Sequence, residues 1–88
     1  MRLLTTLAAA YTERGEYKRS ADLCQRILGE DEYNEAAWYR LMSNYVLADQ
    51  TEAAQFCYRK YAEIVSEGLG EEGAPDFDEI CQQIKSER

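Results

Sequence analysis

The chain has 88 residues, of which 45% are apolar and 31% are charged, and its formal net charge is −7. This composition is typical of one small folded domain, and the negative charge argues against a segment that binds a nucleic-acid backbone on its own. No apolar run is long enough to span a membrane. Three cysteines without paired spacing, and the lack of any histidine, exclude the usual zinc sites.

Helical periodicity, together with residues that typically start or end helices, predicts five helices near residues 2–14, 17–29, 34–47, 51–67 and 76–87. Gly15 suits the turn after the first helix. Asn34 is a plausible N-cap for the third helix. Asp49, followed three residues later by Glu52, resembles a capping box at the start of the fourth helix. Glycines and a proline over 68–75 predict a loop before the last helix.

The first pair of helices and the second pair are related by a shift of 34 residues, which is the period of the tetratricopeptide repeat, a helix–turn–helix unit. Large apolar positions fall on large ones and small positions on small ones under this shift. The repeat positions are Leu7, Tyr11, Gly15, Trp38, Leu41, Tyr45, Ala54 and Tyr58. The predicted fold is therefore all-α, a single domain over 1–88 of two tetratricopeptide-like antiparallel hairpins (1–33 and 34–67), the loop 68–75 and a capping helix (76–88) in an α-α superhelix.

Small side chains at two equivalent positions predict where the helices of each hairpin cross most closely. These are Ser20 in the first hairpin and Ala54 in the second. A leucine at either position would separate the helices, at a cost of roughly 1–3 kcal/mol.

The first helix has no preceding neighbour to cover its apolar edge of Leu3, Leu4 and Leu7. Because apolar surface left in water forfeits stabilisation, we expect an isolated chain to pair through this edge. The alternative is that upstream residues of a longer protein cover it.

In tetratricopeptide repeats the first helix of each hairpin lines a concave groove that binds a partner. The corresponding positions here are Arg2, Thr5, Ala9, Thr12, Glu13, Ala36, Tyr39, Ser43, Val46 and Leu47. We predict a protein partner at Arg2, Thr5, Tyr39, Ser43, Val46 and Leu47, because Val46 and Leu47 make the groove partly apolar and Tyr39 is amphipathic. The alternative is that the final helix or upstream residues cover these side chains.

Catalysis is not indicated, and we predict no catalytic, cofactor-binding or metal-binding residue. Without histidine, acid–base chemistry would need carboxylates or cysteines in a cleft. The carboxylates instead follow helix ends and exposed faces, and no glycine-rich phosphate loop follows a strand. Each cysteine falls among apolar helical positions, which indicates core packing and a reducing cytoplasm.

Acidic residues are concentrated at the C-terminal end of the chain. Residues 1–62 carry eight basic and nine acidic side chains, whereas residues 63–88 carry two basic and eight acidic ones. A solvated surface that aids solubility is the simpler interpretation. The alternative is a docking patch for a basic partner.

A narrower resemblance covers nearly the whole chain. Asp31 and Glu35 before the third helix, the Leu41-Met42 pair, Ala54 with Tyr58, and the tail of Glu67-Gly68-Leu69-Gly70 followed by Pro75 resemble the bacterial transcriptional activator domain of SARP-type regulators. This resemblance implies a helical module of a larger regulator, with a winged-helix DNA-binding domain upstream of it.

Two functions are therefore considered. The first is a non-enzymatic interaction and oligomerisation module of a bacterial transcriptional activator, cytoplasmic, which pairs subunits or couples a signal or partner to an attached DNA-binding domain. The alternative is a free-standing tetratricopeptide adaptor that binds a peptide or helix in its concave groove and is unrelated to transcription.

Overall fold

The computed structural model describes residues 2–64 and 76–86, which form five helices and, within those ranges, no strand. The helices are α1 (Arg2–Glu13), α2 (Tyr17–Glu30), α3 (Glu35–Leu47), α4 (Thr51–Ile64) and α5 (Phe77–Ser86). Each helix end that falls inside the described ranges lies within one residue of its predicted position. The predicted loop 68–75 lies outside the described residues, as do the last predicted turn of the fourth helix and residue 87.

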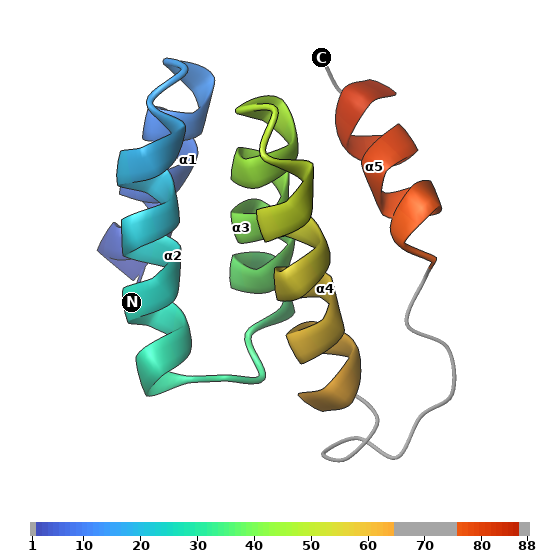
Figure 1. Cartoon of the computed structure of the whole chain (residues 1–88). Helices are drawn as coiled ribbons and strands as arrows, with labels where there is room; N and C mark the ends of the chain where they lie inside the picture. Colours follow the sequence, from blue (N-terminus) through green and yellow to red (C-terminus); the bar gives the residue numbers. More distant parts are fainter. Residues whose placement is uncertain (1, 65–75, 87–88) are drawn as a thin grey trace.

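Two antiparallel hairpins, α1–α2 and α3–α4, stack side by side, and α5 follows beyond them (Figure 1). The α2 helix packs against both α1 and α3, so it joins the two hairpins. The α5 helix packs mainly on α3, where it buries Ile80 and Ile84. The all-α, tetratricopeptide-like class predicted from the repeat is confirmed.

The turn between α1 and α2 follows the geometry of a Schellman motif. Gly15 has a φ of 81°, in the left-handed region that favours glycine. The N–H of Glu16 donates to the C=O of Tyr11 at 2.9 Å, and the N–H of Gly15 donates to the C=O of Thr12 at 3.1 Å. These two bonds satisfy carbonyls that the end of α1 would otherwise leave unpaired.

The turn between α3 and α4 repeats this motif 34 residues later. The N–H of Gln50 donates to the C=O of Tyr45 at 2.8 Å, and the N–H of Asp49 donates to the C=O of Val46 at 3.1 Å. Asp49 has a φ of 62° and occupies the position of the left-handed glycine. The prediction that Asp49 and Glu52 form a capping box was wrong, because Asp49 ends α3 instead of starting α4.

Burial follows the predicted repeat in the core. Ser20 and Ala54, the small residues predicted at the close crossings, are both 0% exposed. Trp38 and Leu41 are also buried, and the ring of Trp38 lies against that of Tyr61 with centroids 6.2 Å apart. The N-cap predicted at Asn34 is confirmed, since its side chain accepts a hydrogen bond from the N–H of Ala37 at 3.0 Å.

Candidate protein-interaction surfaces

The first exposed surface is on α1, and it is named here the α1 edge: Leu3, Leu7 and Ala10. Leu3 is 84% exposed and Leu7 is 43% exposed, and Ala10 is exposed as well. Their equivalents 34 residues later in α3, where α2 and α4 pack, are each 5% exposed or less: Ala37, Leu41 and Asn44. The repeat thus places the same helix face in the core in the second hairpin and in solvent in the first. Leu7 was predicted both as a repeat position and as part of the uncovered apolar edge, and it is exposed because no described helix covers its side of α1.

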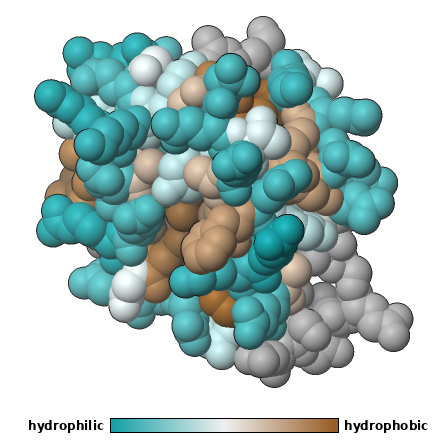
Figure 2. All heavy atoms as spheres, in the orientation of Figure 1, coloured by the Kyte–Doolittle hydropathy of each residue, from teal (hydrophilic) through white to brown (hydrophobic). Residues whose placement is uncertain are grey.

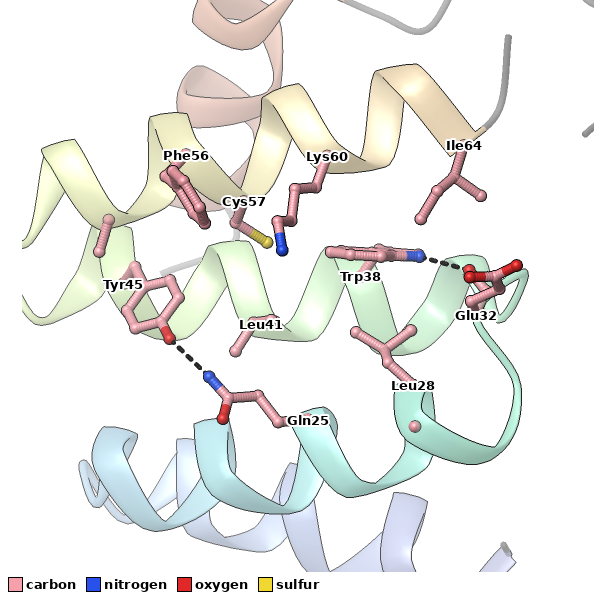
Figure 3. A pocket seen from close by; sticks show the side chains of 12 residues that line it. Gln25, Leu28, Glu32, Trp38, Leu41, Tyr45, Phe56, Cys57, Lys60 and Ile64 are labelled. Carbon is pink, nitrogen blue, oxygen red and sulfur yellow. Dashed lines mark hydrogen bonds between the residues drawn. The ribbon is translucent and has the colours of Figure 1, made fainter. Parts of the chain in front are cut away.

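The second surface is a groove of about 530 Å³. Helices α2 and α4 form its walls and α3 forms its floor (Figure 3). Apolar atoms gather in the hollow between α2 and α4 on the face seen in Figure 2. We call it the α2–α4 groove, and its main apolar lining is Leu28, Trp38, Leu41, Phe56, Cys57 and Ile64.

Two hydrogen bonds hold the aromatic side chains of this groove in place (Figure 3). The amide nitrogen of Gln25 donates to the hydroxyl of Tyr45 at 3.1 Å, which links α2 to α3. The indole N–H of Trp38 donates to the C=O of Glu32 at 2.7 Å. Burial raises the pKa of the Tyr45 hydroxyl above its ordinary value of 10.0. The floor of the groove is therefore preformed.

One cation lies at the groove. The ammonium of Lys60 is 5.2 Å from the ring centroid of Phe56, a cation–π distance, and it points into the groove in Figure 3. No carboxylate of the described residues lies within ion-pair distance of this ammonium. Phe56 itself is 62% exposed. The groove thus offers apolar contacts beside an ammonium that forms no ion pair within residues 2–64 and 76–86, and Glu32 belongs to the same lining.

Sequence signals for this groove were present but weak. Phe56 lies between the α4 positions Ala54 and Tyr58, off the apolar stripe that packs into the hairpin. A large apolar residue off that stripe indicates an exposed contact, but periodicity alone does not show that α2 stands opposite to it.

The residues predicted to bind a partner on the first helix of each hairpin lie in different environments. Thr5 is exposed on α1, and the side chain of Arg2 lies outside the described part of the chain. Tyr39 is half-buried, in a small hollow shared with Ile80 of α5. Val46 and Leu47 are half-buried against the core. Partner binding at these positions stays a prediction.

Ser43 and Thr12 were placed in the concave groove by position, and the structure corrects both. Ser43 is buried, and its hydroxyl donates to the C=O of Tyr39 at 2.9 Å, one turn earlier in α3. Thr12 is buried between helices and hydrogen-bonded there. Neither hydroxyl is accessible to a partner.

Thr12 belongs to a buried polar cluster that joins three helices. Its hydroxyl donates to the amide oxygen of Asn44 at 2.7 Å, and the amide nitrogen of Asn44 donates to the hydroxyl of Ser20 at 2.9 Å. The Ser20 hydroxyl donates in turn to the C=O of Ala8 at 2.8 Å. We call Thr12, Ser20 and Asn44 the polar triad. No buried side-chain nitrogen or oxygen in the described residues lacks a partner.

Cys24 and Cys57 are buried packing residues, as predicted, whereas Cys81 is half-buried. Burial raises the pKa of the Cys24 thiol to about 11 and that of the Cys57 thiol to about 12, so both are protonated and unreactive at neutral pH.

Within residues 2–64 and 76–86, no group of three acidic or cysteine side chains is close enough to hold a metal ion. None of the described helices is both long and apolar enough to cross a membrane.

The repeat, the helical hairpins and the capping helix agree with the comparison against protein families. The family model of the bacterial transcriptional activator domain matches residues 1–85. The chain belongs to this family. The family is one of transcriptional activators and is regulatory rather than enzymatic. Neither the curated proteins nor the solved structures gave a match.

Proposed function

We propose that this bacterial transcriptional activator domain is a protein-interaction and oligomerisation module of a larger cytoplasmic regulator. Its role is positional, since it pairs subunits and so couples a signal or partner to an attached winged-helix DNA-binding domain. The domain itself does not need to contact DNA for this role.

One observation supports self-association most directly. The α1 edge exposes Leu3 and Leu7 at repeat positions that are buried in α3. Full burial of an exposed leucine side chain contributes about 1.5–3 kcal/mol. Because Leu3 is 84% and Leu7 43% exposed, covering both stabilises an assembly by about 2–4 kcal/mol before the cost of association is subtracted. The shape of the face suits a packed helix, because its equivalent in α3 already receives α2.

The test is the oligomeric state of the 88-residue chain, measured by light scattering coupled to size exclusion over a hundredfold range of concentration. We expect concentration-dependent association of the wild type. The double variant Leu3→Glu/Leu7→Glu is expected to associate at least tenfold more weakly, because each glutamate would have to be desolvated in the interface. Tyr33→Glu is the matched control, since Tyr33 is 51% exposed and belongs to the connection between α2 and α3, not to the α1 edge.

Circular dichroism is expected to show the same helix content in the wild type and both variants, because the changed side chains are exposed. A wild type that remains monomeric at the highest concentration would rule out self-association. So would a double variant that associates as strongly as the wild type.

A further inference from the structure

We propose that the α1 edge of one copy docks into the α2–α4 groove of a second copy. This inference rests on the self-association proposed above, and it names the surface that receives the edge. The contact is between two different surfaces, not between two α1 edges.

The exposed apolar side chains support this pairing. Four large apolar side chains are exposed in the described residues: Leu3, Leu7, Tyr33 and Phe56. Two belong to the α1 edge and Phe56 belongs to the α2–α4 groove. The exposed faces of α2 and α5 carry no large apolar side chain. A single contact between edge and groove therefore covers three of the four.

The dimensions of the two surfaces agree. The groove follows α4 from Ala53 to Ile64, a length of about 16 Å at the rise of an α-helix. The stretch of α1 from Leu3 to Glu13 is about 15 Å long. Leu3, Leu7 and Ala10 have the i, i+4, i+7 spacing of a helix that inserts its apolar face into a groove.

Charge also favours this occupant. The α1 helix has no charged residue from Leu3 to Tyr11, so docking it desolvates no charge along that length. The first charged residue after this stretch is Glu13, which is exposed and forms no ion pair within the described residues. The groove lining carries one basic residue, Lys60, whose ammonium forms no ion pair within the described residues, and one acidic residue, Glu32. The neighbouring Arg14 is already paired with Glu16 at 3.3 Å.

The experiment uses two complementary variants of the 88-residue chain. The edge variant, Leu3→Glu/Leu7→Glu, has an intact groove. The groove variant, Phe56→Glu/Lys60→Glu, has an intact edge. We expect each variant alone to be monomeric at concentrations where the wild type associates. An equimolar mixture is expected to form a 1:1 heterodimer in sedimentation velocity, because one chain supplies the edge and the other supplies the groove.

Arg59→Glu is the matched control for the groove variant, since it makes the same charge reversal at an exposed α4 position outside the groove lining. It is expected to associate like the wild type. Lys60→Glu alone is a milder variant that keeps Phe56, and it is expected to weaken association at least threefold. Circular dichroism checks that each variant keeps the helix content of the wild type.

The outcomes separate this inference from the proposed function. If the edge variant is monomeric while the groove variant associates like the wild type, the edges pair with each other and the groove is not the receiving surface. Two monomeric variants that form no heterodimer on mixing would also overturn the inference. A wild type that is monomeric would overturn both proposals together.

Discussion

The two hairpins have the same backbone geometry, but the side chains at the point where their helices cross most closely are polar in one and apolar in the other. In the first hairpin the crossing contains Thr12 and Ser20, whose equivalents in the second are Val46 and Ala54. Both turns have the same pair of terminal hydrogen bonds and both place a left-handed residue at the same position. At the first crossing, Thr12 and Ser20 form hydrogen bonds with Asn44 of α3, whereas at the second crossing the side chains make only apolar contacts.

This difference shows what a polar crossing adds to the same fold. Apolar packing excludes water but tolerates small shifts of one helix along another. The polar triad has donors and acceptors that match in only one alignment of α1, α2 and α3, and a mismatch would leave a buried polar group unpaired. We interpret the triad as the feature that fixes the position of α1, the helix that carries the exposed α1 edge.

The largest effect is expected when one member of the triad is removed. Asn44→Ala leaves the hydroxyls of Thr12 and Ser20 buried without their amide partner, and it leaves a cavity. We expect it to lower the free energy of unfolding by about 2–4 kcal/mol, measured by urea denaturation. At the second crossing, Val46→Ala removes apolar atoms alone and is expected to cost less, because Val46 is half-buried.

The matched control converts the first crossing to the chemistry of the second. The triple variant Thr12→Val/Ser20→Ala/Asn44→Leu removes all three polar groups together, so none is left unpaired. We expect its free energy of unfolding to lie within about 1 kcal/mol of the wild type, although Asn44→Ala alone costs more. A triple variant that loses as much as the three single changes added together would show that the triad does not act as a unit.

The helices and their stacking were predictable because local signals fix them. Apolar periodicity and the glycine of the first turn act within a few residues along the chain, and the small residues at 20 and 54 occupy equivalent positions of the 34-residue repeat. The triad was not predictable, because Thr12 finds its partners 8 and 32 residues away. In the sequence alone, a buried threonine bonded to another helix has the same pattern as an exposed threonine on a helix face.

The interaction surfaces were predictable to a smaller extent. An apolar edge of Leu3, Leu4 and Leu7 was predicted on the first helix; Leu3 and Leu7 are exposed as expected, whereas Leu4 is half-buried. The α2–α4 groove depends on the spacing between two helices that are not consecutive, and on the direction of the Lys60 and Phe56 side chains. Neither follows from the periodicity of α4.

A smaller effect is expected at the two left-handed turn residues. Gly15→Ala places a Cβ at a φ of 81°, which an L-residue rarely adopts, and is expected to lower the free energy of unfolding by about 1 kcal/mol. Asp49→Gly relieves the same conformation at a φ of 62° and is expected to raise it by about 0.5–1 kcal/mol. Thermal denaturation of the two variants should therefore shift the melting temperature in opposite directions. Shifts of the same sign would contradict the equivalence of the two turns.

The smallest effect concerns the buried thiols, one in each hairpin. Desolvation by burial raises the pKa of Cys24 to about 11 and, together with the neighbouring Cys24 thiolate, that of Cys57 to about 12, both from an ordinary value of 9.0. Arg40 and the Ser20 hydroxyl oppose the shift at Cys24, and Lys60 opposes it at Cys57.

Stability is therefore expected to fall as the pH rises above 9. An unfolded thiol loses its proton near pH 9, whereas the folded thiols keep theirs until about pH 11 and 12, so the stability present below pH 9 is lost between pH 9 and 12. The loss is below about 1 kcal/mol per thiol at pH 9.5, and it is measured by urea denaturation from pH 8 to 10. Cys24→Ala and Cys57→Ala should reduce this slope by similar amounts, because both thiols stay protonated in the folded chain over that range. A free energy of unfolding that is constant or rises from pH 8 to 10 would show that neither thiol is held protonated by the fold.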